Sequence, residues 1–501
     1  MNDPSENRPP EAQSIYRLRA QATFVEKEQS LYLILSYPLK CIRLNRSWSQ
    51  VFQTMASHDF FSLDEILSLL DHVDTGSTEF FLDELVRKGF MEHRGIAHLT
   101  TYPFVSIIIP VYNRPHDLAA CLQSLVGQNY PPERFEILVV DDASTDHTAA
   151  VAAAFPVRLL ELRRNRKAPY CRNLAARQAS GEILAFTDSD CLADRLWLRE
   201  LVPAFTHPKT GAVGGLVDSY YETRPLDRYE KVHSSLNMGY WPRRSNRNNP
   251  FFYVPSCNLL VRREAFQRVG GFREELIVGE DVDLCWRIGK QGYDIEYRPV
   301  GKVYHRHRNR LMAFCQRRFD YGTSEPKLQR LHPEKSKQLV FTSGAVLFWS
   351  VLLLGITFKS WALAALCPVP VFADVAIKAS AIHRRKIPVG FTSLLLAVVR
   401  SYLAGLYQCC AFVSRYYLLW AVVITPFLPL IAAIITGMHL LTGMVGFLLK
   451  RPKLNPVIFL FYFSLEQLSY QSGVWWECLK TFSFKAVRPA ITAKPPVYQR
   501  K

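Results

Sequence analysis

The sequence predicts an α/β fold built on a mostly parallel sheet, with a small winged-helix-like module before it and a helical membrane region after it. β-branched runs at 105–110, 137–140 and 183–186 are bounded by turn residues, and a helical stretch at 118–125 lies between the first two runs. Strands that alternate with helices in this way are typical of a parallel sheet. The membrane region is predicted by residues 339–358, twenty residues without a charge, which are enough to cross the hydrocarbon core of a bilayer.

The composition limits the class of protein and of partner. The chain has 501 residues, with 61 Lys and Arg against 44 Asp and Glu, and a formal net charge of +17. This balance suits an anionic partner, such as a nucleotide, a phosphate, an acidic lipid surface or nucleic acid, and charge does not choose among them. The 11 cysteines are scattered without a CxxC pair, which argues against a disulfide framework or a zinc ribbon and favours a reducing, cytosolic compartment. Residues 1–14 lack the basic-then-apolar order of a signal peptide, and we expect a disordered tail there.

Residues 15–100 are predicted to form the small N-terminal module. A short strand at 31–36 precedes helical patterns at 48–56, 63–70 and 78–88, the last with capping residues in front of it. One strand, three helices and a basic, glycine-containing end suggest a winged helix. Winged helices bind DNA, peptides or other domains, and the composition of this module does not choose among them.

Residues 339–480 are predicted to be embedded in a membrane or to lie at its interface. A weaker span at 361–377 is interrupted by prolines, and a long run at 416–449 contains two prolines that offer a bend. The long run therefore forms either two short spans or a re-entrant hairpin. The stretch 389–413 carries a charge near its middle, which favours a place along the interface. The number of crossings stays open between two and four, and a very apolar globular core is the alternative.

Basic clusters predict the orientation of these spans. Lysines and arginines occur at 378–386 and at 450–453, and residues 481–501 form a basic tail. Because Lys and Arg prefer the cytoplasmic side, spans that arrive in pairs would keep every cluster inside the cell. We therefore expect a multi-pass protein of the cell membrane, in contact with membrane lipids, whose α/β domain at 104–335 is cytoplasmic.

Polar and acidic side chains follow the predicted strands of this domain, at the edge where open parallel sheets bind ligands. Pro110, Tyr112 and Asn113 end the first strand, and Asp141 and Asp142 end the second. Carboxylates at this place can accept hydrogen bonds from a uracil imide and from ribose hydroxyl groups. The alternative is structural, with Asp142 or Ser144 capping the helix that follows.

Asp188 and Asp190 directly follow the third predicted strand. Two carboxylates beyond a buried strand are costly if they stay unpaired, and a hard divalent cation that bridges them to a diphosphate would pair them. A D-x-D string also occurs by chance in soluble loops. Its place after an apolar strand favours the cation site.

Residues 279–287 place acids, including Glu280 and Asp281, at the start of an apolar-periodic helix. One explanation is that acids there stabilise the helix through its dipole. The functional interpretation makes Asp281 a general base that deprotonates a hydroxyl nucleophile.

The stretch 298–318 is densely basic and includes His305 and His307. Guanidinium groups match phosphate oxygens, whereas nucleic acid and anionic lipid head groups are competing partners. Histidines in such a run are phosphate contacts, surface residues or metal ligands. His305 is a candidate ligand for a metal or a diphosphate.

The order PVYN, VVDDASTD, FTDSD, GEDVDLCWR and QRRFDYG resembles the inverting family-2 glycosyltransferases, which have an A-type, nucleotide-diphospho-sugar-binding fold. The resemblance covers about residues 104–325. It implies that Asp141 and Asp142 lie at the base and ribose of the donor. It also implies a Mg²⁺ or Mn²⁺ ion and the sugar diphosphate at Asp188 and Asp190, with Asp190 favoured as the direct ligand.

The same resemblance assigns the remaining site residues. Asp281 would be the catalytic base, with Glu280 beside it, and Arg172 and Asn173 would belong to a loop that lines the donor pocket. The motif QRRFDYG is similar to the QxxRW string of processive synthases but lacks its Trp, so processivity stays open. The donor-binding candidates in this motif are Gln316, Arg317, Arg318 and Tyr321.

The reaction that this resemblance implies is a single displacement with inversion. The metal ion and the arginines would stabilise the charge that grows on the leaving nucleoside diphosphate. Asp281 would remove a proton as an acceptor hydroxyl attacks C1 of the sugar from the opposite face, unlike the two-carboxylate chemistry of glycoside hydrolases.

The layout of the whole chain resembles the mycofactocin-system glycosyltransferases, through YPLKCIRL at 37–44 and LEQLSYQSGVWW at 465–476. That family is implied to carry an N-terminal part similar to the peptide-binding element of pyrroloquinoline-quinone-type chaperones. It is implied to add glucose from UDP-glucose to a hydroxyl of a peptide-derived redox cofactor. Nucleic acid is then not an expected partner. The alternatives are transfer to polyprenyl phosphate or to a polysaccharide, and a non-catalytic membrane scaffold whose winged helix binds a peptide or DNA.

Overall fold

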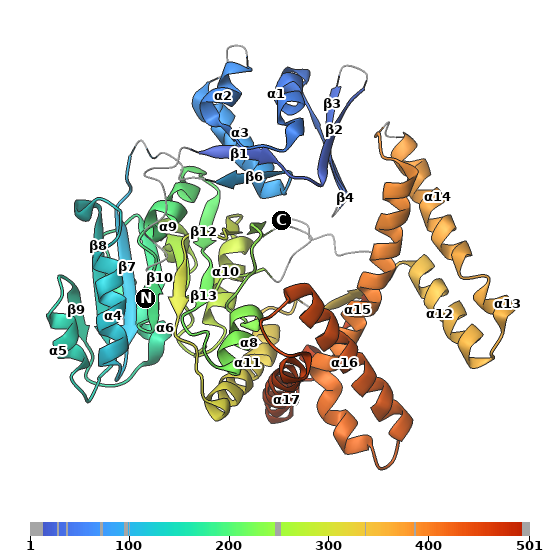
Figure 1. The fold of residues 1–501 in the computed structure, drawn as a ribbon. Helices are drawn as coiled ribbons and strands as arrows, with labels where there is room; N and C mark the ends of the chain where they lie inside the picture. The colour runs from blue at the N-terminus through green and yellow to red at the C-terminus, as the bar shows by residue number, and fades with distance from the viewer. Residues whose placement is uncertain are drawn as a thin grey trace. The chain divides into compact units, whose positions relative to one another are not determined.

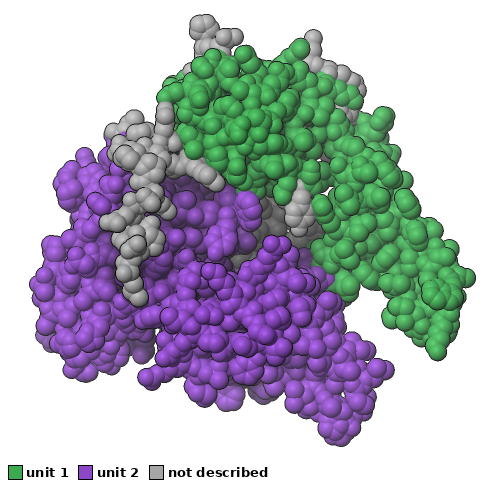
Figure 2. All heavy atoms as spheres, in the orientation of Figure 1, with its two compact units in different colours: residues 1–98, 340–406, 491–494 green, residues 99–339, 407–490, 495–501 purple. Residues whose placement is uncertain are grey.

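The structure is a computed structural model that describes residues 14–27, 30–36, 39–70, 74–94, 99, 101–245, 252–335, 337–384 and 387–492. Nearly all of the expected disordered tail, residues 37–38 of YPLKCIRL, residues 385–386 of the first basic cluster and the end of the basic tail lie outside the described residues. The chain divides into two compact units (Figure 2). The first comprises 1–98, 340–406 and 491–494, and the second comprises 99–339, 407–490 and 495–501.

An eight-stranded sheet forms the centre of the second unit (Figure 1). Its strand order is β14-β16-β12-β15-β10-β7-β8-β9, and six strands run the same way while β14 and β15 run opposite to them. The three strands predicted from β-branched runs are neighbours in it: β7 (Val105–Val111), β8 (Phe135–Asp141) and β10 (Ile183–Thr187). The mostly parallel α/β fold is therefore confirmed. The other strands are β9 (Arg158–Glu161), β12 (Thr210–Gly214), β14 (Arg243–Arg244), β15 (Asn258–Arg262) and β16 (Asp294–Tyr297).

Helices cover both faces of this sheet. Ile107 of β7 packs with Leu118 of α4 (Pro115–Val126), whereas Ile108 packs in a separate cluster with Cys171 of α6 (Lys167–Gln178). Because successive strand residues point to opposite faces and both faces are buried, these strands are continuous apolar runs in the sequence. The helical stretch expected at 118–125 is part of α4. The other helices of this domain are α5 (Thr148–Ala153), α7 (Trp197–Leu201), α8 (Pro225–His233), α9 (Arg263–Arg268) and α10 (Glu280–Lys290).

A smaller sheet follows the end of β10. It contains β11 (Cys191–Ala193), β17 (Val303–His305) and β13 (Val217–Ser219), in that order. β11 pairs antiparallel with β17, and Cys191 lies opposite His305 in the register. This pairing brings residues that are far apart in the sequence to one point beside the strand end of β10.

Two long helices of the second unit, α11 (Leu311–Leu331) and α17 (Pro456–Thr481), cross at glycines. A Cβ atom on Gly322 would lie 2.0 Å from the carbonyl oxygen of Tyr470, and one on Gly473 would lie 2.1 Å from that of Phe319. Real Cβ atoms do not approach a backbone oxygen so closely, so the two backbones are in direct contact because neither position carries a side chain. We call this contact the glycine crossing.

Helix α17 was expected in the membrane region, but several of its buried side chains are polar. They are Glu466, Gln467, Gln471 and Glu477. A Tyr229 hydroxyl on α8 donates to Glu466 at 2.6 Å, which ties α17 to the α/β domain. These contacts explain why the segment is less uniformly apolar than the helices that precede it.

Three helical segments in the described part of the chain are long and apolar enough to cross a membrane, by length and composition: Trp361–Arg384, Phe391–Ile424 and Pro429–Lys450. The bend expected near the two prolines of the long run is the break between the second and third segments, and 389–413 mostly continues into the second one as a single helix. The run at 339–358 gives a helix of 15 residues, which is short for a span. The helices are α12 (Ser343–Thr357), α13 (Trp361–Ala364), α14 (Pro368–Arg384), α15 (Phe391–Ile424) and α16 (Pro429–Lys450).

The N-terminal module contains more β-structure than the single strand that the sequence predicts. Its strands form two three-stranded sheets, in the orders β2-β3-β4 and β5-β1-β6. The expected strand is β3, and the three expected helices are present as α1 (Ser49–Thr54), α2 (Leu63–Ser68) and α3 (Thr75–Lys88). The other strands are mostly short or partly exposed, so they leave no apolar run in the sequence. The strands are β1 (Ile15–Leu18), β2 (Ala22–Lys27), β3 (Ser30–Ser36), β4 (Leu39–Leu44), β5 (Phe61–Ser62) and β6 (Met91–Arg94), and two short strands elsewhere are β18 (Gln338–Val340) and β19 (Ala490–Thr492).

Candidate active site

Asp141 is a hydrogen-bond acceptor for its own loop at the end of β8. The Ser144 hydroxyl donates to Asp141 Oδ1, and the Ser144 N–H donates to Oδ2 at 3.2 Å. Asn113, whose φ is 50°, accepts from the Thr145 N–H at 2.8 Å. The loops after β7 and β8 are thus tied to each other, and part of the role of Asp141 is to hold them.

Asp142 fixes the loop that leads into α6. Its carboxylate accepts from the backbone N–H groups of Arg166, at 2.6 Å, and Lys167, at 2.8 Å. Asn165 donates from its side chain to the Asp142 carbonyl oxygen at 3.2 Å. Because Asp142 is buried, these bonds compensate for the burial of its carboxylate. The acid therefore orients the helix that carries Arg172.

The Arg172 guanidinium joins the two acidic motifs that the sequence placed far apart. It is buried and donates to Asp188 Oδ1 at 2.6 Å and to Glu280 Oε1 at 2.9 Å. A buried guanidinium with a carboxylate on each side is a stable arrangement because each charge is paired. Burial alone would raise the pKa of Asp188, but electrostatic interactions, above all with the Arg172 guanidinium, hold this pKa below its ordinary value.

Asp281 lies at the first turn of α10, next to Glu280. Its Oδ2 accepts from the Ser256 N–H at 3.1 Å, and its Oδ1 accepts from the Val282 N–H at 2.8 Å. Burial and the negative charge of Glu280 raise the pKa of Asp281 from 3.8 to about 7. A carboxylate with this pKa can take up and release a proton near neutral pH, which is what a general base requires.

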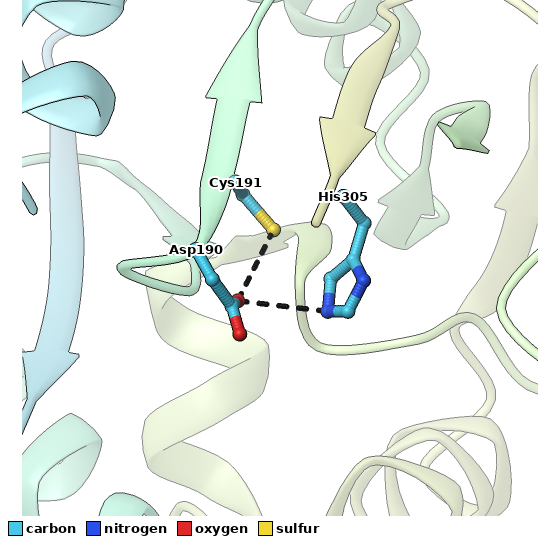
Figure 3. Close-up of side chains that lie close together, drawn as sticks. All are labelled: Asp190, Cys191 and His305. Atoms are coloured by element: carbon cyan, nitrogen blue, oxygen red, sulfur yellow. Dashed lines mark hydrogen bonds and ion pairs between the residues drawn. The ribbon is translucent and has the colours of Figure 1, made fainter. Parts of the chain in front are cut away.

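Asp190 directly precedes Cys191 of β11 and faces His305 of β17, the strand paired with it (Figure 3). Its Oδ1 lies 3.5 Å from His305 Nε2 and 3.9 Å from Cys191 Sγ. Its Oδ2 accepts from Arg114 at 2.6 Å. Oxygen, nitrogen and sulfur atoms of these residues converge on one point, so the group could hold a metal ion.

A cavity opens beside these acids. Asp188, Asp190 and His305 line one part of it, and Arg317 and Tyr321 of α11 line another. The Arg317 guanidinium lies 4.7 Å from the centre of the Tyr321 ring. Carboxylates that can hold a cation and guanidinium groups that can hold phosphate therefore face the same space. Its lining also includes Glu230, His307, Arg308 and Arg318.

Arg318 has structural partners besides its place at the cavity. It is buried, donates to Glu230 at 2.7 Å and lies 3.6 Å from Glu466 of α17. The guanidinium therefore neutralises two buried carboxylates from different helices. Its first role is to support the cavity wall.

Four other predicted donor-binding residues lie away from the acidic group, or their polar atoms are bonded to other parts of the chain. Gln316 is exposed and donates to Asp320 at 2.9 Å. Asn173 is buried and donates to the Phe272 carbonyl oxygen at 2.8 Å. Pro110 lies inside β7, and Tyr112 is 45% exposed at the end of that strand. The structure thus brings Asp188, Asp190, His305, Arg172, Glu280 and Asp281 into one connected group, and it places the others around or outside it.

Two residues of the site carry no signal that sequence reasoning used. Arg114 pairs with Asp190 from a position directly after PVYN, and Ser256 supplies the N–H that fixes Asp281. Proximity to PVYN could have pointed to Arg114. Nothing local marks Ser256, because its role depends on a contact between the segment before β15 and the start of α10.

Comparison with known proteins relates part of the chain to a protein family. Residues 106–270 match the family described as Glycosyl transferase family 2. The chain is 29% identical over 406 residues to the pre-mycofactocin glycosyltransferase of Mycobacterium tuberculosis strain H37Rv, covering 77% of this chain and 82% of that protein. It is 34% identical over 205 residues to the glycosyltransferase AglE of Haloferax volcanii, covering 40% of this chain and 65% of that protein.

Among solved structures, the chain is similar to the mannosyltransferase PcManGT from Pyrobaculum calidifontis, which was solved in complex with GDP-Man and Mn²⁺. The two align with a TM-score of 0.38 and 23% identity, over 61% of this chain and 88% of that one. The family match spans β7 to β10 and both strand-end acid pairs. The matched segment carries Asp188, Asp190 and Arg172 of the connected group, and Glu280, Asp281 and His305 lie beyond it. Residues 106–270 are therefore a glycosyltransferase domain of family 2, and over most of its length the chain resembles a pre-mycofactocin glycosyltransferase.

Proposed function

We propose that this glycosyltransferase moves a hexose, with glucose favoured, from a UDP-sugar to a hydroxyl group of a peptide-derived redox cofactor of the mycofactocin type, with inversion at C1. The observation that carries the proposal is the Arg172 bridge. It joins Asp188, on the side of the expected diphosphate, to Glu280, the neighbour of the expected base Asp281. The side of the expected diphosphate and the expected base are therefore held next to each other, and a single displacement needs the donor and the base to be close.

The residues around the cavity suit a divalent cation of the Mg²⁺ or Mn²⁺ type. Asp190 and His305 would hold it, with Asp188 next to them, because carboxylate oxygens and an imidazole nitrogen are ordinary ligands for such ions. The cation would offset the negative charge that grows on the leaving diphosphate. Arg317 and Arg308 line the same cavity and can bind phosphate oxygens that the cation leaves free.

Asp281 supplies the base in this proposal. With a pKa of about 7, an appreciable fraction of it is ionised at neutral pH, and it can accept the proton of an attacking hydroxyl. The Ser256 N–H holds its Oδ2 in place. The base and ribose of the donor would lie at the ends of β7 and β8, near Tyr112 and Asn113, with Asp141 and Asp142 shaping those loops.

Acceptor and membrane attachment rest on the similarity to the pre-mycofactocin enzyme and on the three apolar segments. We assign a peptide-binding role to the N-terminal module at 15–100 and a membrane-spanning role to the apolar segments. The basic residues at 378–386 and 450–453 favour a cytoplasmic catalytic domain.

The test uses the full-length chain in detergent with UDP-glucose and each acceptor class in turn: a peptide-derived cofactor precursor, polyprenyl phosphate and a polysaccharide. We expect UDP release and a glucosylated product with the first acceptor. Asp281→Asn should lose transfer while donor binding is kept, and Glu264→Gln, a change of an exposed glutamate on α9, is the matched control. Transfer to either of the other acceptors alone would replace the acceptor assignment. Unchanged transfer by Asp281→Asn would contradict the mechanism.

A further inference from the structure

Asp190, Cys191 and His305 bring a thiol and an imidazole next to a carboxylate, and a site for a hard cation does not need the thiol. Asp190 Oδ1 lies 3.5 Å from His305 Nε2 and 3.9 Å from Cys191 Sγ, and all three ligand atoms lie within 4.8 Å of one another (Figure 3). The antiparallel pairing of β11 with β17 sets this arrangement, because Cys191 and His305 are opposite each other in the register. The thiol is therefore held at the site by the backbone.

These distances are close to those of a tetrahedral zinc centre. Bonds of about 2.0 Å to oxygen and nitrogen and about 2.3 Å to sulfur give an oxygen–nitrogen separation of about 3.3 Å and an oxygen–sulfur separation of about 3.5 Å. The two measured separations exceed these values by a few tenths of an ångström. The sulfur and nitrogen atoms lie within 4.8 Å of each other.

The other atoms of the group are engaged in ways that leave the three ligand atoms aimed inwards. Arg114 binds Asp190 Oδ2, so Oδ1 is the oxygen that faces the imidazole and the thiol. His305 Nδ1 lies 3.2 Å from His307 Nδ1, which leaves Nε2 toward Asp190. Outer contacts of this kind orient metal ligands. The cavity borders Asp190 and His305, so the fourth position is open to it.

We propose that Asp190, Cys191 and His305 form a three-ligand site for a thiophilic divalent cation of the zinc class. The thiolate and imidazole favour such an ion, whereas Mg²⁺ prefers oxygen ligands. The site shares Asp190 and His305 with the cation assigned to the sugar diphosphate, so zinc competes with that cation. This competition rests on the proposed function, but zinc binding itself does not.

The test uses Co²⁺ as a spectroscopic probe of the full-length chain in detergent. Co²⁺ bound through a thiolate gives a charge-transfer absorption, and tetrahedral Co²⁺ gives intense visible bands. We expect both in the wild type, displaced by added Zn²⁺. Cys191→Ser should lose the charge-transfer band and weaken Zn²⁺ binding by about tenfold or more. Cys257→Ser, which changes another buried thiol beside Cys191, should keep the band.

The proposal is overturned if the wild type gives no thiolate band or if the band persists unchanged in Cys191→Ser. Thermal unfolding of both serine variants establishes that each is folded. A second readout is Zn²⁺ inhibition of Mn²⁺-supported transfer, which should need about ten times more Zn²⁺ in Cys191→Ser. A Cys191-dependent Co²⁺ band without any turnover of UDP-sugar would leave the metal site standing and would refute the proposed function. Turnover of UDP-sugar without a Cys191-dependent Co²⁺ band would support the proposed function and refute the zinc-class site.

Discussion

Replacing Glu280 with glutamine should shift the pH dependence of transfer toward acid. Burial and the negative charge of Glu280 together raise the pKa of Asp281 to about 7. A glutamine keeps the length of the side chain and an oxygen for Arg172 but removes the charge. The ionised form of Asp281 is then favoured, so its pKa falls. Arg172 would also have one anion fewer to neutralise, so its positive charge would stabilise ionised Asp281 more strongly and lower the pKa of Asp281 further.

The expected size of the shift follows from the pKa of Asp281. In the wild type, a base with a pKa of about 7 is ionised in about a tenth of the molecules at pH 6 and in about nine tenths at pH 8, so kcat/KM should rise about tenfold between them. Burial contributes more to the raised pKa than Glu280 does. We therefore expect Glu280→Gln to move the acidic limb down by about one pH unit, which corresponds to about 1.4 kcal/mol.

The assay is UDP release from UDP-glucose in the presence of acceptor, followed as kcat/KM across neutral pH. Glu264→Gln is the control, because this exposed glutamate pairs with Arg268 on the same helix and lies on α9, outside the cavity lining. Its acidic limb should coincide with that of the wild type. A limb of Glu280→Gln that stays in place or moves to higher pH would falsify the assignment of Asp281 as the titrating base.

Three further outcomes follow from the structure. EDTA should stop transfer, and Mn²⁺ or Mg²⁺ should restore it, whereas full activity in metal-free buffer would contradict a cation at Asp190. Arg318→Met should lower the unfolding free energy by about 3–5 kcal/mol because the buried Glu230 loses its guanidinium partner and the buried Glu466 loses one of its partners. Arg268→Met, at an exposed ion pair, should change it by less than about 1 kcal/mol. Equal unfolding midpoints of the two variants would refute this prediction. Gly322→Ala should lower the unfolding free energy by about 3 kcal/mol or more because its Cβ atom would clash with the Tyr470 carbonyl oxygen. Gly289→Ala, with no atom near its Cβ position, should instead stabilise α10 by about 0.5–1 kcal/mol. Thermal unfolding of the two variants checks this difference.

Local patterns in the sequence predict the α/β domain well. The β-branched runs at 105–110, 137–140 and 183–186 are strands because both faces of the sheet are buried, which leaves an uninterrupted apolar signal. Asp188 and Asp190 follow from the same signal, since the end of a strand fixes where the next side chains lie. The N-terminal strands mostly lack such runs, and for that reason all but one were missed.

Contacts between distant segments could not be predicted from local patterns. The basic stretch offered His305 as a candidate metal ligand, but the strand pairing that brings it to Asp190 joins two three-residue strands, which are too short a signal to detect. Arg172 was expected to line a donor pocket, but its partners are two acids on other elements. Helix α17 resembles the preceding apolar helices in length, and only its burial against α8 and α11 explains Glu466.

The glycine crossing has a practical consequence for anyone who wishes to work with the α/β domain in isolation. Helix α11 supplies Arg317 and Tyr321 to the cavity. The helix that packs against it at the glycine crossing, α17, comes after all the apolar helices in the sequence. A fragment that stops before residue 339 would lose α17 and leave Arg318 without Glu466. Removing the apolar helices while keeping the enzyme intact would require an internal deletion that rejoins 456–481 to the rest, not a simple truncation.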